Sequence, residues 1–155
     1  MCHMDHIHQI NISKGGVPKL PVTSVYVSKN GIVGDKQKNK KYHGGPDRAV
    51  CLFSMEVLEE LQREGHPIYP GSTGENLTLY YSDYHLLQEG IQLRLGEDVV
   101  IEITSYTAPC KTIVQSFLDG AFNRISQKIY PGNSRVYGKV IQEGWIQKGD
   151  GITKM

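Results

Sequence analysis

Cys110 is the residue of this sequence with the clearest potential for chemistry. It follows Pro109, which cannot donate a hydrogen bond to a sheet, so we expect a strand to end there and a loop to begin. The neighbouring Lys111 carries a positive charge that favours the thiolate, the form of cysteine that attacks electrophiles and binds metals. The sequence therefore indicates Cys110 as a candidate nucleophile or metal ligand, with an ordinary half-buried thiol as the alternative.

A basic, glycine-rich loop from Gly34 to Ala49 is the second candidate site. It contains four lysines, a histidine, a Gly-Gly-Pro turn and an Asp-Arg pair. Glycines let backbone N–H groups approach a ligand closely, and the lysines and Arg48 supply positive charge. This composition predicts a loop that holds an anion such as a phosphate. The alternative is a solvated hairpin end.

The segment from Gly71 to Asn76 is also polar and rich in glycine. Its backbone could donate hydrogen bonds, and Glu75 and Asn76 could pair with a heterocycle. From this segment alone, a simple turn before a strand is the preferred interpretation.

The remaining cysteines and the N-terminal histidines give weaker signals. Cys51 lies among valine, leucine and phenylalanine, where burial favours the neutral thiol, and we interpret it as an inert core residue. The group Cys2, His3, His6 and His8 matches no common zinc spacing, so we predict no native metal there. Three cysteines are too few for a disulfide framework.

Length and charge exclude several classes of function. A chain of 155 residues suits a single domain, here residues 1–155. A net charge of +1 gives no global field, so no nucleic-acid partner is implied. No apolar run approaches the ~20 residues that span a bilayer, and the N-terminus lacks the apolar core of a signal peptide. We therefore expect a cytoplasmic protein with no membrane partner.

Strands dominate the expected secondary structure. Alternating or continuous apolar residues predict strands over residues 6–12, 22–27, 48–53, 75–79, 91–95, 99–103 and 135–142. A short amphipathic helix is expected over residues 55–64, capped by Ser54 and ended by Gly65. Phe122, Ile125 and Ile129 mark a second helix. The expected fold class is mainly β, a small barrel with a few short helices in its connections.

Three blocks of the sequence together resemble the MOSC domain, which is named for the C-terminal part of molybdenum-cofactor sulfurases. They are Gly34-Asp35 through His43-Gly44-Gly45-Pro46-Asp47-Arg48-Ala49, then Gly74-Glu75-Asn76-Leu77, then Pro109-Cys110. The resemblance is to the stand-alone type and implies a β-barrel of about this size. In that family, the cysteine matching Cys110 is proposed to carry sulfur as a persulfide, received from a pyridoxal-phosphate-dependent cysteine desulfurase, or to bind molybdenum.

The resemblance also implies a binding site for the molybdenum cofactor (molybdopterin). Arg48 and Lys36 would meet the pterin phosphate, Gly44 and Gly45 would donate backbone hydrogen bonds, and Asp47 would orient Arg48 or cap the turn. Glu75 and Asn76 would face the pterin ring. His43 and Lys111 complete the predicted set, and Cys110 would be the metal ligand.

The sequence leaves three functions open. The first is a carrier of molybdenum cofactor or sulfur on Cys110, for the maturation of metal–sulfur cofactors. The second is a molybdenum oxidoreductase subunit that reduces N-hydroxylated compounds. No ferredoxin-type cysteine set is present, so electrons would come from a separate protein. The third is a barrel that binds a phosphate-bearing small molecule without sulfur or metal chemistry.

Overall fold

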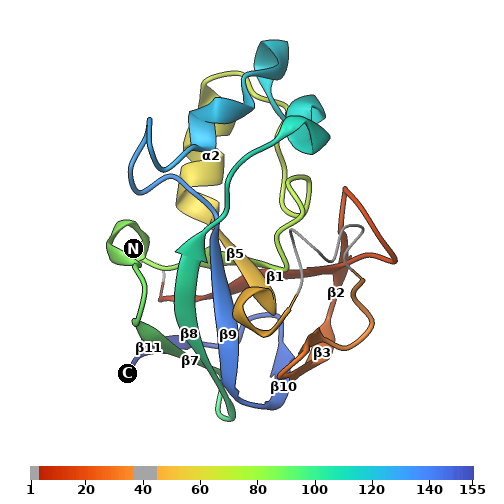
Figure 1. Ribbon diagram of the computed structural model, residues 1–155, viewed down its shortest axis with the longest axis vertical. Helices are drawn as coiled ribbons and strands as arrows, with labels where there is room; N and C mark the ends of the chain where they lie inside the picture. The colour runs from red at the N-terminus through yellow and green to blue at the C-terminus, as the bar shows by residue number, and fades with distance from the viewer. Residues whose placement is uncertain (1–3, 37–44) are drawn as a thin grey trace.

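The computed structural model describes residues 4–36 and 45–155 (Figure 1). Its strands are β1 (His6–Ile12), β2 (Leu20–Val22), β3 (Ser24–Ser28), β4 (Gly31–Ile32), β5 (Val50–Ser54), β6 (Leu77–Tyr80), β7 (Gln92–Leu95), β8 (Val99–Tyr106), β9 (Val136–Gln142), β10 (Gly144–Gln147) and β11 (Ile152–Lys154). Its helices are the α-helix α2 (Met55–Arg63) and the 3-10 segments η1 (Pro46–Arg48), η2 (Tyr84–Leu86), η3 (Lys111–Ser116), η4 (Leu118–Gly120) and η5 (Phe122–Ile125).

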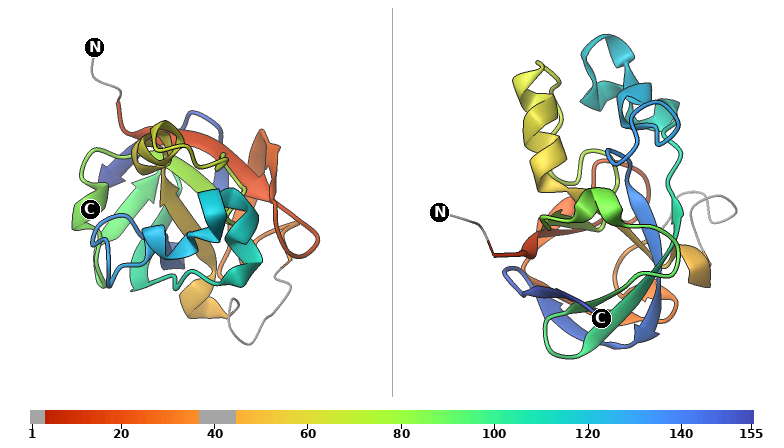
Figure 2. Two further views of the ribbon diagram at one scale, coloured as in Figure 1. Left: turned by 90° about the horizontal axis from the view of Figure 1, so that it is seen from above. Right: turned by 90° about the vertical axis from the view of Figure 1, so that its left-hand side faces the viewer.

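The strands form a curled, barrel-like arrangement. An eight-stranded sheet has the order β11-β7-β8-β9-β5-β6-β1-β2, and a three-stranded sheet has the order β10-β3-β4. Ile7 N donates to Asp150 O at 2.9 Å and Gly149 N donates to Ile7 O at 2.8 Å, so β1 meets the turn before β11. The right-hand view of Figure 2 shows the strands curled below α2 and the 3-10 segments η3 to η5. The predicted mainly β fold class is confirmed.

Two hydrophobic cores lie one above the other. The larger core fills the barrel and is built from residues such as Ile7, Leu77 and Ile101. The smaller core lies between α2 and the 3-10 segments η3 to η5. We call α2 and these three segments together the helical cap. The members of the smaller core include Leu58 of α2 and Phe117, the residue that follows η3. The smaller core therefore holds η3, and with it the loop that carries Cys110, against α2.

Helix α2 begins and ends where the sequence predicts. Ser54 Oγ accepts a hydrogen bond from Val57 N at 3.1 Å, which satisfies one free N–H of the first turn. At the other end Gly65 adopts a φ of 100°, and His66 N donates to Leu61 O at 3.1 Å. This left-handed ending favours glycine because a side chain there would be strained.

Two expected elements differ from the structure. The strand predicted over residues 22–27 is divided, because β2 pairs with β1 in the large sheet while β3 pairs with β10 and β4 in the small one. The second predicted helix is only the single 3-10 turn η5. Phe122 and Ile125 pack into the helical cap, whereas Ile129 is 58% exposed and gives a longer helix nothing to bury.

Candidate functional site

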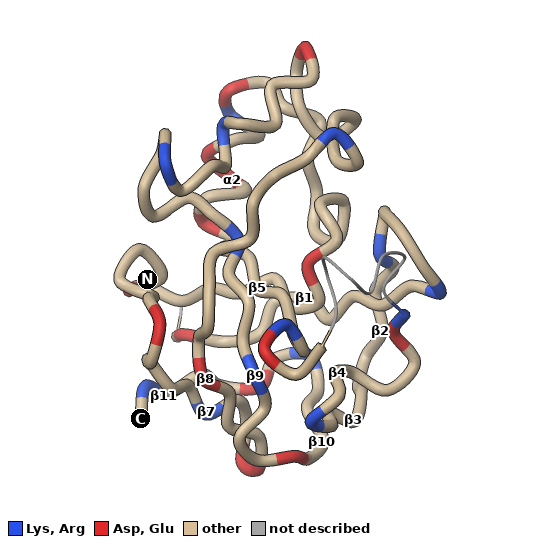
Figure 3. Tube along the Cα trace, viewed as in Figure 1, with Lys and Arg blue, Asp and Glu red and all other residues tan. Residues whose placement is uncertain are grey.

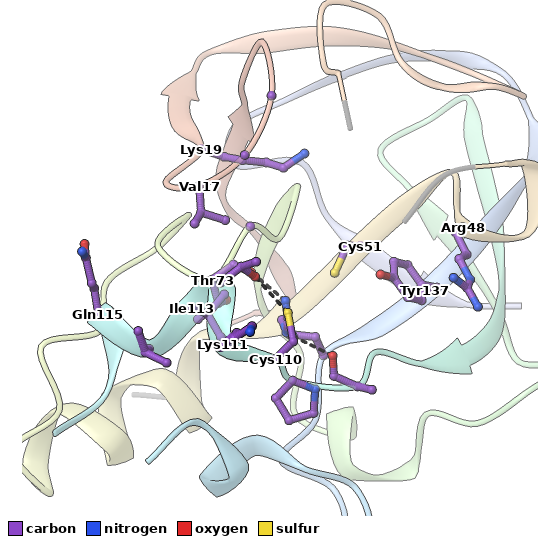
Figure 4. Close-up of a pocket in the computed structure, with 18 of the residues that line it drawn as sticks. Val17, Lys19, Arg48, Cys51, Thr73, Cys110, Lys111, Ile113, Gln115 and Tyr137 are labelled. Atoms are coloured by element: carbon purple, nitrogen blue, oxygen red, sulfur yellow. Dashed lines mark hydrogen bonds between the residues drawn. The ribbon is translucent and has the colours of Figure 1, made fainter. Parts of the chain in front are cut away.

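A cavity of about 1340 Å³ brings the candidate segments together (Figure 4). Its walls come from β5, β9 and three loops, which are residues 15–19 between β1 and β2, residues 73–74 before β6, and residues 106–115 from the end of β8 into η3. Segments more than one hundred residues apart in the sequence, such as those of Gly15 and Tyr137, therefore share one binding space. A cavity of this kind is the usual place for a small ligand.

Cys110 lies on the wall of this cavity, directly before η3. It is half-buried and its thiol is free, with Sγ 2.9 Å from Thr112 Oγ1. Strand β8 ends at Tyr106, so the predicted position of Cys110 in the loop after a strand is confirmed. Ile113, just beyond it, is buried in the helical cap and holds this loop in place.

Positive side chains are frequent among the described residues that line the cavity. Those that the structure describes there are Lys19, Lys36, Arg48, Lys111 and Arg135, and no aspartate or glutamate is among the described lining residues. Elsewhere acidic and basic residues are intermixed along the trace (Figure 3). Asp35 balances the charge of Lys19, at 2.6 Å. Because like charges around a concave space add their fields, the other positive side chains favour an anion in the cavity although the whole chain is nearly neutral.

Arg48 extends from η1 along the cavity wall. Its guanidinium carbon lies 5.5 Å from the ring centroid of Tyr137 on β9, a cation–π contact. Burial raises the pKa of Tyr137 to about 12, so its hydroxyl stays protonated at neutral pH. Asp47 is exposed and its backbone carbonyl accepts from Thr104 Oγ1, so it fixes η1 against β8 rather than lining the cavity. Gly45 precedes η1 with a φ of 95° and is also exposed.

Glu75 lies behind the cavity, not on its described lining. Its side chain is 0% exposed, and its carboxylate accepts hydrogen bonds from Gly71 N at 3.1 Å and from Thr73 Oγ1 and Thr78 Oγ1 at 2.8 Å. These bonds hold the turn before β6 in shape. Thr73 and Gly74, from the same turn, are the residues that reach the cavity.

Asn76 is likewise 0% exposed and joins three segments. Its Oδ1 accepts from Cys51 N at 2.9 Å and its Nδ2 donates to Asp35 Oδ2 at 3.0 Å. Asp35 in turn forms a buried ion pair with Lys19, at 2.6 Å. Glu75 and Asn76 therefore shape the cavity from behind, and neither is among its described lining residues.

Cys51 is the second described cysteine on the cavity, and it differs from Cys110. It lies within β5 and is 4% exposed, with Sγ 3.7 Å from Thr107 Oγ1. Burial raises the pKa of its thiol, and the positive charge of Arg135 only partly opposes this rise. The neutral, inert thiol that the sequence predicts agrees with this environment.

Arg135 is a cavity residue that sequence reasoning missed. Its Nη1 donates to Thr73 O at 2.6 Å and its Nη2 to Ala108 O at 3.5 Å, so it links the two loops that face each other near Cys110. The available signal was a charged residue at the first position of a predicted strand, directly before Val136 and Tyr137.

Other predicted positions lie elsewhere. His43, Gly44, Cys2 and His3 are outside the described residues. His6 and His8 pack against the ring of Tyr80, with ring centroids 5.3 and 5.4 Å apart. In the part of the chain that is described, no three histidine, cysteine or acidic residues gather to hold a metal, and no helix is long and apolar enough to cross a bilayer.

Comparison with known proteins decides the family. The model of the MOSC domain matches residues 39–153, which is most of the chain. The chain belongs to the MOSC domain family. This MOSC domain is 30% identical to the YflK protein of Bacillus subtilis over 139 residues, 86% of the chain and 60% of YflK. It is 30% identical over 134 residues to a protein named reductase from Gibberella moniliformis, covering 83% of the chain but 23% of that protein. The chain thus spans at most 60% of these relatives.

Solved structures agree with the family. YiiM from Geobacillus stearothermophilus is 26% identical and superposes with a TM-score of 0.76 over 97% of this MOSC domain and 75% of that chain. The YuaD protein of Bacillus subtilis superposes with a TM-score of 0.72 over 97% of this chain and 94% of its own; at 18% identity it shows the fold alone.

Proposed function

We propose that this MOSC domain binds the molybdenum cofactor at Cys110, or carries sulfur there as a persulfide, in the maturation of a metal–sulfur cofactor. One observation carries the proposal, namely that a half-buried free thiol shares a cavity with five positive side chains. A free thiol also suits a reducing compartment, so the proposal includes the cytoplasm as its location.

The residues of the cavity fit the cofactor. A thiolate is a suitable ligand for a metal–sulfur centre, and Cys110 would provide it. Arg48, Lys36 and Lys111 would hold the pterin phosphate, Arg48 through its planar fork and the lysines as point charges. When bound, the cofactor would supply a molybdenum centre that accepts sulfur ligands and electrons.

As a sulfur carrier, the domain needs one reaction at Cys110. The Cys110 thiolate attacks the outer sulfur of a persulfide on a cysteine desulfurase that uses pyridoxal phosphate. The sulfur–sulfur bond of the donor breaks, the donor cysteine leaves as a thiolate, and Cys110 becomes the persulfide. No external oxidant is required, because the transferred sulfur keeps its oxidation state.

A transfer assay tests this reaction. The purified domain is incubated with a cysteine desulfurase and cysteine, and the protein-bound sulfane sulfur is measured. We expect about one sulfur per chain for the wild type and for Cys51→Ser, and none for Cys110→Ser, since a hydroxyl cannot form the persulfide. Equal loading of wild type and Cys110→Ser would contradict the proposal.

The second candidate is a molybdenum oxidoreductase subunit that reduces N-hydroxylated compounds. It is supported by the likeness to the protein named reductase, of which this chain matches only 23%. The chain would therefore depend on a separate electron donor. This function predicts loss of an N-hydroxylated substrate only when both cofactor and reductant are supplied.

Plain binding of a phosphate-bearing ligand is the third function. It predicts that Cys110→Ser still binds such a ligand, that Arg48→Ala no longer binds it, and that neither sulfur transfer nor reduction of an N-hydroxylated compound occurs.

A further inference from the structure

Arg135 is a buried cation with an unused hydrogen-bonding edge. The residue is 6% exposed and lines the cavity. Its Nε has no hydrogen-bond partner, and its Nη2 has only the long contact of 3.5 Å to Ala108 O. Nε and Nη2 form one edge of the guanidinium, and that edge is the fork that binds the two oxygens of a carboxylate or phosphate.

Arg124 in the helical cap shows the same edge in use. Its Nε donates to Glu64 Oε1 at 3.0 Å and its Nη2 donates to Glu64 Oε2 at 2.8 Å, so a carboxylate occupies the fork. The Tyr130 ring covers the guanidinium at 4.3 Å. Arg124 is therefore an arginine whose charge is balanced within the chain.

Arg135 has no ion-pair partner among the described residues. Its side chain donates to the carbonyl oxygens of Thr73 and Ala108, and no described carboxylate lines the cavity. Burying a charge without a counter-charge costs free energy, as does burying an N–H group without an acceptor. A ligand that supplies an acceptor would remove both costs, and the cavity is where a ligand would arrive.

We propose that the Nε–Nη2 edge of Arg135 is a second anion subsite of the cavity, which binds an oxyanion group of the ligand beside Cys110. This subsite is additional to the place at Arg48 that would hold the pterin phosphate. The inference rests on one part of the proposed function, namely that the cavity is the ligand site. An oxyanion gains both N–H groups of the edge, and the protein gives up only the long contact to Ala108 O. The ligand or substrate of this protein therefore carries a phosphate, sulfate or carboxylate at its Cys110 end.

The test uses the cofactor-free chain of 155 residues and small anions as probes. Iodoacetamide is neutral, and the rate at which it alkylates Cys110 is followed by peptide mass spectrometry, which separates Cys110 from Cys2 and Cys51. The measurement is made with phosphate, sulfate, acetate or chloride at equal ionic strength. We expect phosphate to slow the alkylation of wild-type Cys110 about tenfold at saturation and chloride to leave it unchanged. The comparison of phosphate and sulfate with acetate tells which oxyanion class the subsite takes.

Two variants and a control separate the subsite from general charge. Arg135→Gln should weaken phosphate binding about tenfold, and Arg135→Lys should weaken it less because the charge remains but the fork does not. Arg124→Gln is the matched control, because Arg124 is a half-buried arginine outside the cavity. In this variant phosphate should protect Cys110 from alkylation as it does in the wild type. If Arg135→Gln does not fold, the phosphate protection of Cys110 in Arg135→Lys tests the subsite.

Two results would overturn the inference. One is wild-type alkylation that is indifferent to every oxyanion, and the other is phosphate protection that both Arg135 variants retain in full. The outcome is independent of sulfur or molybdenum chemistry, because the thermal shift produced by phosphate can also be measured in Cys110→Ser. If that variant keeps the phosphate response but carries neither sulfur nor cofactor, the subsite and the proposed function both stand. If wild type loads no sulfur or cofactor yet binds phosphate through Arg135, only the proposed function fails.

Discussion

Two walls of one cavity each present a cysteine, and the walls differ in construction. On one side Cys51 is part of β5, buried by neighbouring strands, with its backbone N–H bonded to Asn76 Oδ1. On the other side Cys110 lies in the loop between β8 and η3, half-buried and beside Lys111 (Figure 4). The wall formed by β5, which we call the strand wall, favours the neutral thiol of Cys51. The wall formed by the loop between β8 and η3, which we call the loop wall, leaves the thiol of Cys110 accessible from the cavity.

The difference teaches that position in the fold, rather than the residue type, decides which thiol reacts. A strand that is buried on both faces offers packing, and a loop held by a second core offers both access and a fixed place. The loop wall is fixed because Ile113 and Phe117 are buried against α2.

The largest expected effect is on thiol reactivity. In the native protein, iodoacetamide should alkylate Cys110 on the order of 10³-fold faster than Cys51, because Cys51 reacts only when β5 opens and such opening costs several kcal/mol. Peptide mass spectrometry over a time course measures both rates in one sample. In urea the two rates should converge. Equal rates without urea would remove the distinction between the walls.

The second effect is on stability. Cys51→Ser should lower the free energy of unfolding by about 1–3 kcal/mol, since it buries a hydroxyl without a close partner. The present contact to Thr107 Oγ1 spans 3.7 Å, a length that suits sulfur but not oxygen. Cys110→Ser should change stability by less than about 0.5 kcal/mol. Urea unfolding of both variants gives the comparison, and a larger loss for Cys110→Ser would reverse it.

The third effect is the pH dependence of stability. Burial raises the pKa of Cys51 above its ordinary value of 9.0, so the folded protein holds this proton more tightly than the unfolded chain. The resulting stabilisation is complete below pH 9.0 and is lost as the pH rises through the raised pKa. Burial raises the pKa of Tyr137 to about 12, which acts with the same sign at higher pH.

Unfolding midpoints at several values of pH above neutrality test this dependence. Cys51→Ala should lose less stability in alkali than the wild type, by about 1 kcal/mol per pH unit at most. A steeper alkaline loss in Cys51→Ala than in the wild type would show that this thiol is not held neutral by burial.

The smallest effect concerns the positive charge of Lys111 beside Cys110. Lys111→Glu should slow the alkylation of Cys110 by about two- to threefold, because an exposed charge stabilises the thiolate only weakly in water. High salt should reduce the difference further. Lys154→Glu, the same charge change in β11 and away from the cavity, is the control. A rate for Lys111→Glu equal to that of the control would remove Lys111 from the account.

Local sequence signals predicted the elements that carry the site. The alternation of residues 91–103 predicted the hairpin of β7 and β8, the Ser54 cap predicted α2, and Pro109 predicted the strand end before Cys110. Each of these depends on neighbours within a few residues, so the chain itself contains the information.

Contacts between distant segments were beyond such signals. The pairing of Lys19 with Asp35 and the links from Arg135 to Thr73 and Ala108 join residues brought close only by the curled sheet. The segment at Glu75 shows a second difficulty. A polar, glycine-rich turn predicts many hydrogen bonds but does not tell whether the side chains face a ligand or, as here, groups of the turn itself and of β6.

Native mass spectrometry of the intact protein tests the central claim, that Cys110 is the residue which holds molybdenum cofactor or sulfur. The wild type, Cys110→Ser and Cys51→Ser are expressed in cells that make both the cofactor and a cysteine desulfurase, and are purified without reductant. We predict that the wild type and Cys51→Ser carry the mass of the cofactor or of one added sulfur atom, and that Cys110→Ser carries neither. A wild-type protein without either addition, or a Cys110→Ser protein that carries the same addition as the wild type, would contradict the claim.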